Sequence, residues 1–293
     1  MAVMTFDQFQ ETFNRIIFEK SKADLLGKIA SSPSRYIGLF RPTKPKGKIL
    51  QNLLQSHEIR FGDAFEAVIE QYLRLKKCQI LPKRISSSDG DSLNVDQLFE
   101  RNDKIYFIEQ KVRDDHDSTK KRGQIDNFEK KLAVLLKQYH ENQLVGIVYF
   151  IDPELTKNKN FYITELDKMY RDYNVELHLF YGHELFSYLE YQDIWDEILD
   201  YLRAWKERIP DLPEINFDRD AYHTFNEIKD LNPIVYRKLL NNDEILNEII
   251  NTLFPERRTL TLLHDYFNSK SSTIYRTLTD RLGSYLGIRK TLF

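Results

Sequence analysis

Three residues in the middle of the chain have the types and spacing needed to hydrolyse a phosphodiester bond. They are Asp96, Glu109 and Lys111. This reaction needs a water activated near neutral pH and positive charge on the phosphate in the transition state, and one or two Mg²⁺ ions can supply both. Mg²⁺ takes hard oxygen ligands, usually one or two carboxylates with waters and a phosphate oxygen. Two carboxylates beside one lysine therefore indicate metal-assisted phosphodiester hydrolysis.

A predicted β-hairpin brings these three residues together. The runs LNVDQLFE and KIYFIEQKV both resemble strands, and residues 101–103 between them have the length of a hairpin loop. Residues i and i+2 of a strand share a face, so Glu109 and Lys111 point to the same side. Asp96 lies on the preceding strand, near the pairing partner of this end. We therefore expect the three side chains to converge at the edge of a sheet.

The spacing of the acid and the lysine is not specific by itself. The chain has two other such pairs, in Glu129–Lys131 and in Glu227–Lys229. Both fall in predicted helices, where residues i and i+2 point about 200° apart, so neither can form this site. Taken alone, Glu109-x-Lys111 is more often an ordinary solvated strand end. Asp96 and the basic segment that follows favour the functional interpretation.

The elements around the hairpin predict a mixed α/β core. The runs LVGIVYFI and VELHLFY resemble strands, and helical patterns lie between and after them. The first third of the chain is helical by pattern, apart from a proline-containing irregular stretch. The helices are predicted at about residues 6–30, 57–77, 125–142, 163–173 and 182–208, and the irregular stretch at residues 31–47.

Pro210 and Pro213 in the run IPDLPEINF predict a domain boundary. Residues 1–209 are expected to form the α/β domain with a helical N-terminal extension. Residues 210–293 are helical by pattern throughout. Their last two helices have the length and turn of a helix-turn-helix, in which Thr273, Tyr275, Arg276 and Thr279 would face outward. The alternative is a subdomain for packing or dimerisation.

Composition limits the remaining possibilities. The chain has 293 residues, 41% of them hydrophobic, so it should fold. No secretory signal is visible, and no apolar run approaches the roughly 20 residues that span a bilayer, so we expect a soluble cytoplasmic protein. One cysteine excludes internal disulfides and cysteine-rich zinc sites. A glycine-rich phosphate loop of the G-x-x-x-x-G-K-[ST] type is absent, so no nucleotide cofactor is expected.

Charge is segregated along the chain. The net charge of −2 argues only weakly against a nucleic-acid partner, because binding depends on where the basic residues lie. One basic stretch holds Arg41, Lys44, Lys46 and Lys48, and another holds Lys120–Arg122. Either stretch alone is compatible with an ordinary solvated surface.

Asp96 followed by Glu109-Gln110-Lys111 resembles the signature of the PD-(D/E)XK nuclease superfamily. The order of elements is also similar: helix, strand, Asp-bearing strand, Glu-x-Lys strand, helix, strand. The runs EQKVRDDHDSTKKRGQIDNFEKK and FGDAFEAVIEQYL resemble bacterial type II restriction endonucleases in particular. The resemblance covers roughly residues 35–205. One departure is Val95, which stands where the signature has a proline that is often missing in the family.

This resemblance implies a role for each matching residue. Asp96 and Glu109 would bind Mg²⁺, for which Mn²⁺ can substitute, and Lys111 would position the attacking water. Glu66 matches a helix carboxylate of the family and would complete the metal site directly or through water. The alternative for Glu66 is a solvent-facing helix residue in an i,i+4 arrangement with Glu70.

DNA contacts are expected from residues that follow the active strand. These residues would meet phosphates, with Arg122 and Gln124 also able to reach base edges. If the C-terminal helix pair reads DNA, Thr273 and Arg276 would take part. The whole predicted set is Arg113, Lys120, Lys121, Arg122, Gln124, Thr273 and Arg276.

The leading hypothesis is therefore a type II restriction endonuclease that cuts double-stranded DNA at a short specific sequence. A repair or recombination nuclease of the same fold and a DNA-binding protein without catalysis are the alternatives. A palindromic target would favour a two-fold homodimer, whereas an asymmetric target permits a monomer.

Overall fold

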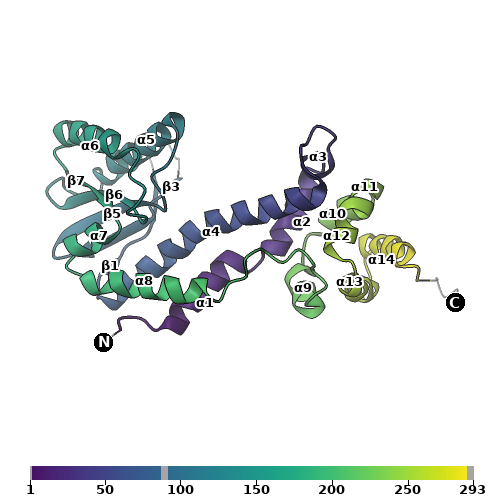
Figure 1. Ribbon diagram of the computed structural model, residues 1–293. Helices are drawn as coiled ribbons and strands as arrows, with labels where there is room; N and C mark the ends of the chain where they lie inside the picture. The colour runs from purple at the N-terminus through teal and green to yellow at the C-terminus, as the bar shows by residue number, and fades with distance from the viewer. Residues whose placement is uncertain (1, 87–91, 289–293) are drawn as a thin grey trace. The chain divides into compact units, whose positions relative to one another are not determined.

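The computed structural model describes residues 2–86 and 92–288, and it divides the chain into two compact units. The first unit comprises Met1–Phe13 and Phe61–Ile209, and the second comprises Asn14–Arg60 and Pro210–Phe293. The long helix α4 (Pro45–Leu75; Figure 1) begins in the second unit and ends in the first. None of the helices in these described ranges is long and apolar enough to cross a membrane.

The first unit is built on a five-stranded mixed sheet with the strand order β1-β4-β5-β6-β7. The pairs β1–β4 and β4–β5 are antiparallel, whereas β5–β6 and β6–β7 are parallel. The predicted fold class, a mixed sheet flanked by helices with a helical C-terminal region, is confirmed. The strands are β1 (Gln79–Ile80), β4 (Gln97–Arg101), β5 (Lys104–Lys111), β6 (Leu144–Phe150) and β7 (Glu176–Tyr181).

Helices cover both faces of this sheet (Figure 1). On one face the ring of Phe107 stacks on Phe128, with ring centroids 4.9 Å apart. On the other, the ring of Tyr149 meets that of Phe186 edge to face. One face is covered by α5 (Ser118–Leu135) and α6 (Lys159–Tyr173), and the other by α7 (His183–Tyr188), α8 (Gln192–Lys206), α1 (Phe6–Phe18) and the last part of α4.

The middle of the sheet is buried on both sides, as the continuous apolar run of β6 predicts. Every residue of β6 is buried. Gly146 is required there, because a Cβ at this position would lie 2.6 Å from Leu177 Cδ2 and 2.7 Å from Phe107 Cε1. The absent side chain makes room for the ring of Phe107, which lies on the same strand as Glu109.

The predicted hairpin is present, with one correction. Asn102 and Asp103 have φ values of 50° and 59°, the left-handed pair that closes a two-residue hairpin turn. The run LNVDQLFE, however, is not one strand. Ser92–Asn94 forms β3, which pairs with β2 (Arg84–Ser86) in a separate sheet, and β4 starts only at Gln97. Val95 is buried and donates its N–H to the Lys83 carbonyl at 2.9 Å, so the pairing with the β2 side continues to this residue and the chain joins the main sheet only after Asp96.

Two helices begin earlier than their apolar pattern predicts. The segment before residue 125 was expected to be non-helical, but α5 starts at Ser118 because the Asp117 carboxylate accepts hydrogen bonds from the Thr119 and Lys120 N–H groups. Helix α4 starts at Pro45 inside the stretch predicted to be irregular, and proline is well suited to the first turn of a helix.

The second unit is all helical and has its own apolar core. Leu26 and Ile49 from the first part of the chain pack there with Leu263 and Phe267 from the last part. The sequence placed residues 14–60 with the α/β domain, but in the structure they supply part of this core. The remaining elements are α2 (Ser21–Ser31), α3 (Ser34–Ile37), α9 (Ala221–Ile228), α10 (Pro233–Leu240), α11 (Asp243–Ile245), a π-helical turn (Leu246–Ile250), α12 (Asn251–Leu253), α13 (Arg258–Asn268) and α14 (Thr273–Leu286).

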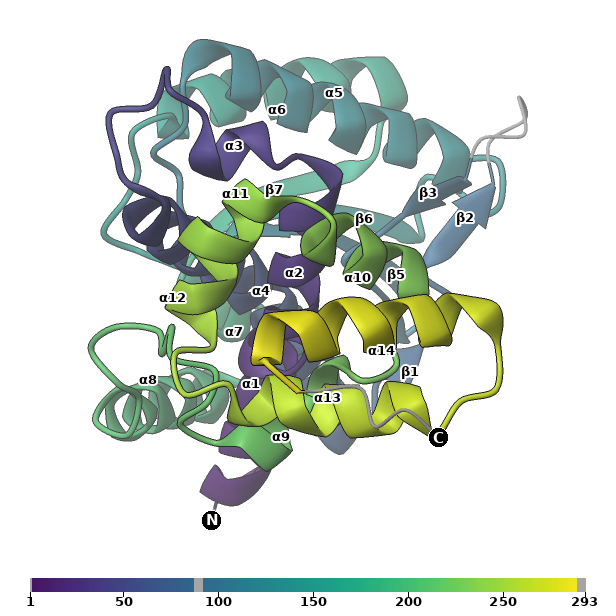
Figure 2. The same ribbon diagram turned by 90° about the vertical axis from the view of Figure 1, so that its right-hand side faces the viewer.

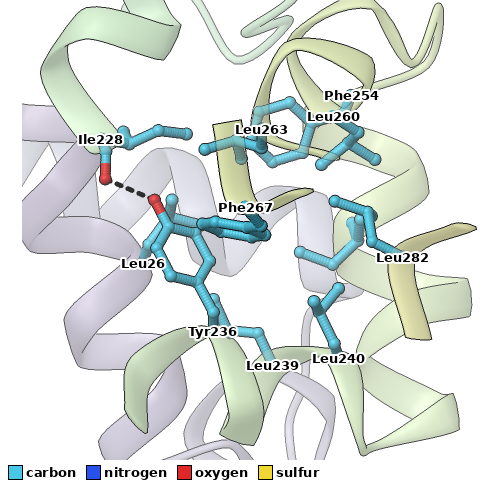
Figure 3. A pocket seen from close by; sticks show the side chains of 11 residues that line it. Leu26, Ile228, Tyr236, Leu239, Leu240, Phe254, Leu260, Leu263, Phe267 and Leu282 are labelled. Atoms are coloured by element: carbon cyan, nitrogen blue, oxygen red, sulfur yellow. Dashed lines mark hydrogen bonds between the residues drawn. The ribbon is translucent and has the colours of Figure 1, made fainter. Parts of the chain in front are cut away.

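A small cavity lies at the centre of this core (Figure 3). Its volume is about 20 Å³, and leucine, isoleucine and aromatic side chains line it. The Tyr236 hydroxyl is turned away to donate to the Ile228 carbonyl. A cavity of this size without polar partners stays dry, so it is a packing feature and not a ligand site.

Candidate active site

Asp96, Glu109 and Lys111 meet at the carboxyl end of β5. Glu109 and Lys111 share a face of this strand, and the Lys111 ammonium lies 2.9 Å from Glu109 Oε1 and 3.2 Å from Asp96 Oδ2. The position is the end of the middle strand of the sheet and not an outer strand. The structure therefore brings together the three residues that the sequence singled out, while their catalytic roles stay a prediction.

Asp96 occupies the break between β3 and β4. Register pairs Gln97 with Ile108, so the position before Gln97 faces Glu109. Asp96 Oδ2 accepts the Gln110 N–H at 2.7 Å, so the backbone of β5 fixes this carboxylate. Asp96 Oδ1 makes no hydrogen bond with any other residue in 2–86 or 92–288, which leaves one oxygen available.

Lys131 is a site residue that sequence reasoning missed. Its ammonium lies 2.5 Å from Glu109 Oε2, and the exposed fraction is 4% for Lys131 and 5% for Glu109. The pair Glu129–Lys131 was set aside because it is helical, but Lys131 approaches Glu109 from another element, α5. A signal was present, because Lys131 follows Phe128 by three positions and precedes Leu135 by four, which puts it on the apolar face of the helix.

The charges at this end of β5 balance without a metal, since two carboxylates meet two ammonium groups. Burial lowers the pKa of Lys111, but the Glu109 and Asp96 carboxylates outweigh it and hold that pKa above its ordinary value. Lys111 is therefore a cation at neutral pH. In that state it can donate hydrogen bonds but cannot serve as a general base.

Glu66 lies on α4 and is ion-paired with a different lysine. Glu66 Oε1 is 2.8 Å from Lys83 Nζ, and Glu70 Oε2 is 2.6 Å from the same nitrogen. Burial raises the pKa of Glu66, Lys83 opposes that shift, and the charge of Asp96 adds to it. No group of three acidic, histidine or cysteine side chains able to hold a metal is found within residues 2–86 and 92–288. The charge of Asp96 thus affects the pKa of Glu66, but the Glu66 carboxylate is paired with Lys83 and not with the Asp96, Glu109 and Lys111 cluster.

Two buried amide oxygens lie on the sheet face opposite Glu109, because neighbouring residues of a strand point to opposite faces. The Oε1 atoms of Gln97 and Gln110 have no hydrogen-bond partner among the described residues. Each residue directly follows a predicted metal ligand, and Gln97 Nε2 donates to the Glu66 carbonyl at 2.7 Å. Unsatisfied buried acceptors are rare in native proteins and are commonly satisfied by water. These two oxygens indicate that ordered water belongs on the α4 face of the sheet, behind the strand that carries Glu109.

Basic residues follow the site, and they differ in exposure. Lys120 and Arg122 are exposed on the first turns of α5, and Arg113 is exposed just before it. Lys121 is half-buried with its ammonium 4.5 Å above the Phe161 ring. The Gln124 Oε1 atom accepts the Tyr162 hydroxyl at 2.5 Å, so its carbonyl oxygen is already engaged within the fold.

A buried carboxylate anchors the segment between the active strand and α5. Asp114 is fully buried and accepts hydrogen bonds from the Asn158 backbone, the Asn158 amide and the Tyr181 hydroxyl. Burial is the main cause that raises the pKa of Tyr181, and the hydrogen bond to Asp114 raises that pKa further. Asp114 thus ties the segment that leads into α5 to Asn158 and Tyr181, while Asp117 caps the helix itself.

Helices α13 and α14 lie side by side in the second unit (Figure 2). Thr273 and Arg276 are exposed in the first turn of α14, as the sequence predicts. Tyr275 was expected to face outward, but its ring packs on Phe267 with centroids 5.6 Å apart. Thr279, also expected outside, is half-buried, so the outward face of α14 is narrower than predicted.

Residues 74–206 match the sequence profile of a protein family described as type II restriction endonuclease, HinfI. The predicted resemblance to type II restriction endonucleases is confirmed. Such an endonuclease is a hydrolase that acts on DNA. The matched range contains Asp96, Glu109 and Lys111, together with Lys131 and the basic start of α5, whereas Glu66 lies outside it. No match was found among curated proteins or among solved structures.

Proposed function

We propose that this restriction endonuclease is a Mg²⁺-dependent, site-specific enzyme that hydrolyses phosphodiester bonds of double-stranded DNA in restriction–modification defence. One observation carries the proposal. The side chains of Asp96, Glu109 and Lys111 meet at one point within the range that matches the restriction endonuclease family. Two carboxylates and a lysine at the end of a buried strand are suited to phosphodiester chemistry.

The residues present fit a divalent metal with oxygen preference. Asp96 and Glu109 offer two carboxylates, which is the number that Mg²⁺ commonly takes from a protein, and Mn²⁺ accepts the same ligands. Asp96 Oδ1 makes no other hydrogen bond among the described residues, and Glu66 would contribute through a water. When bound, Mg²⁺ supplies Lewis-acid activation of water and neutralises phosphate charge.

The protein's own groups would then orient the reactants. Lys111 stays protonated, so its ammonium can donate hydrogen bonds to a water and to a phosphate oxygen. Lys131 holds Glu109 Oε2 and leaves Oε1 facing Lys111 and Asp96. The Gln110 N–H holds Asp96 in the same way from the backbone. Catalysis of this kind depends on groups that are already positioned before the substrate arrives.

Exposed cations near the site would bind the DNA backbone. Arg113, Lys120 and Arg122 would contact phosphates, and Lys121 and Gln124 would contribute less because both pack against α6. Thr273 and Arg276 would make further contacts from the second unit. A palindromic target sequence would be read by a homodimer.

The test is digestion of an unmethylated plasmid by the full-length protein with Mg²⁺. Discrete fragments with ends that map to one short sequence are expected. Nicks that depend on DNA structure would instead indicate a repair nuclease, and a gel shift without cutting would indicate a binding protein. The Glu109→Gln variant, prepared in parallel, excludes a contaminating nuclease.

A further inference from the structure

The loop between α3 and α4 exposes two large apolar side chains side by side. Leu39 is 90% exposed and Phe40 is 99% exposed, more than any other large hydrophobic residue among the described ones. Figure 1 shows this connection as a loop that projects at the start of α4. Burial of apolar side chains is favourable, so a folded chain that leaves both in water forgoes a substantial stabilisation. An exposed apolar pair of this kind indicates a surface that binds a partner molecule.

The loop is anchored at both of its ends. Tyr36 on one side and Ile49 on the other belong to the buried core of the second unit. Gly38 passes so close to α3 that a Cβ there would lie 2.5 Å from the Ser34 carbonyl oxygen. Pro42 and Pro45 restrict the backbone further. The backbone of the loop is therefore restrained, which lowers the conformational entropy lost when Leu39 and Phe40 are bound.

The surroundings of this pair are strongly basic. Residues 25–57 contain six lysines and arginines and no aspartate or glutamate, in a chain whose totals are 43 basic and 45 acidic residues. Nothing in the described chain forms an ion pair with any of the six. They are Lys28, Arg35, Arg41, Lys44, Lys46 and Lys48.

The start of α4 adds to this positive field. Lys46 and Lys48 lie in its first turns with Lys44 just before it, and the first turn has no acidic residue. The N-terminus of a helix carries partial positive charge and usually has acidic residues nearby, so three lysines there are unfavourable without an anion. Basic side chains and a helix N-terminus together suit phosphate groups.

We propose that residues 38–48 form a DNA wedge. Phe40, supported by Leu39, inserts from the minor groove between adjacent base pairs of double-stranded DNA. Arg41, Lys44 and Lys46 hold the phosphates on either side. Proteins that insert an apolar side chain in this way partly unstack a base step and kink the duplex. The proposal rests on the proposed function in taking DNA as the ligand, and it adds a distortion of the substrate.

The charge pattern favours DNA over another protein. A protein partner that covered the apolar pair would also have to neutralise the cations around it, whereas DNA supplies stacked bases and phosphates within one ligand. A second copy of this loop is the poorest partner, because its own lysines and arginines would repel. Self-association through Phe40 is nevertheless one outcome that the experiment detects.

The test measures unwinding of DNA without requiring cleavage. Full-length protein carrying Lys111→Ala is bound to a closed circular plasmid, topoisomerase I relaxes the plasmid, and the linking number is read after the protein is removed. The same background then receives Phe40→Ala, Phe40→Trp or Tyr222→Ala. Tyr222 is a matched control, because it is 72% exposed in the same unit but follows the acidic residues Asp218 and Asp220.

The wedge predicts a lowered linking number for the Lys111→Ala parent, for Phe40→Trp and for Tyr222→Ala. Phe40→Ala should lose this change and bind DNA on the order of tenfold more weakly, the scale of one lost aromatic stacking contact. An unchanged linking number when the parent saturates the plasmid would overturn the proposal. So would full unwinding by Phe40→Ala, or a change from dimer to monomer in that variant. Failure of the wild-type protein to cut plasmid with Mg²⁺ would refute the proposed function separately.

Discussion

The two ends of β5 both carry charged clusters, but they differ in how fully the carboxylates are satisfied. At the amino end one carboxylate, Glu176, takes three partners. Lys104 Nζ lies 2.5 Å from it, Tyr188 donates at 2.5 Å, and His178 Nε2 is 2.9 Å away. Burial raises the pKa of Glu176, yet these partners outweigh it and lower that pKa to about 2.

At the carboxyl end of β5, the carboxylates have fewer partners for their oxygens. Two carboxylates share the Lys111 ammonium, Glu109 has only Lys131 besides, and Asp96 Oδ1 has no donor among the described residues. The comparison shows that charge alone does not mark a reactive site. Glu176 has three partners and serves as a structural residue. At the carboxyl end of β5 the acceptor oxygens outnumber their donors, which leaves room for a metal, a water or a phosphate.

The largest expected effect is on cleavage by variants of the carboxyl-end cluster. Glu109→Ala and Lys111→Ala should each slow DNA cleavage on the order of a hundredfold or more, as is usual when a group that stabilises the transition state is removed. Glu176→Gln should leave the rate unchanged. Single-turnover cleavage, with circular dichroism to correct for folded protein, measures this. An equal loss of cleavage rate in Glu109→Ala and in Glu176→Gln would contradict the distinction between the two clusters.

The next effect concerns stability. Lys131→Met should lower the free energy of unfolding by up to about 3 kcal/mol, because it removes the buried ammonium group on Glu109 Oε2 and leaves only Lys111 to offset that carboxylate. The double variant Glu109→Gln with Lys131→Met should recover most of that loss. Urea unfolding of the four proteins in this cycle gives the coupling energy. Additive losses would mean that the two side chains do not stabilise each other.

Part of this account was accessible from the sequence. The hairpin was predictable because two strand-like runs flank a loop of hairpin length, and Glu109 with Lys111 followed from the strand period. Asp117 also gave a local signal for the start of α5, as an aspartate ahead of Ser118 and Thr119, and it was overlooked. That omission placed the basic residues on a loop instead of a helix.

The rest depends on packing between elements distant in sequence. Lys131 reaches Glu109 only because α5 lies on β5, and Glu66 meets Lys83 only because α4 covers the opposite side. The contribution of α2 to the C-terminal helical core has the same origin, since an amphipathic helix does not specify which apolar surface it will cover.

A moderate effect is expected for the basic start of α5. The double variant Lys120→Ala, Arg122→Ala should reduce the slope of log affinity against log salt by about 1.8, since each lost phosphate contact removes about 0.9. Lys168→Ala is the control, because Lys168 pairs with Glu165 on the exposed side of α6. Fluorescence anisotropy with a DNA duplex at several salt concentrations measures the slope. An unchanged slope would mean that these cations face bulk solvent.

The smallest effect tests the Glu176 cluster. A carboxyl whose pKa falls from 4.5 to about 2 on folding stabilises the protein above pH 4.5, and this stabilisation is lost as pH drops toward 2. Glu176→Gln should therefore be less stable than wild type by at most about 1 kcal/mol near neutral pH, because the side chain is partly exposed. The difference should shrink in acid. A pH-independent difference in urea unfolding would show that packing, not charge, is responsible.

The most direct test of the central claim is a metal titration of cleavage with wild type and Asp96→Asn. Wild type should cut DNA with Mg²⁺ or Mn²⁺ and not in EDTA. With Ca²⁺, which accepts looser coordination geometry, it should bind without appreciable cutting. Asp96→Asn should need much more Mg²⁺ to reach its maximal rate, because one of two charged ligands is lost. Undiminished cleavage in EDTA, or an unchanged Mg²⁺ requirement in Asp96→Asn, would contradict the assignment of this cluster as a metal-dependent active site.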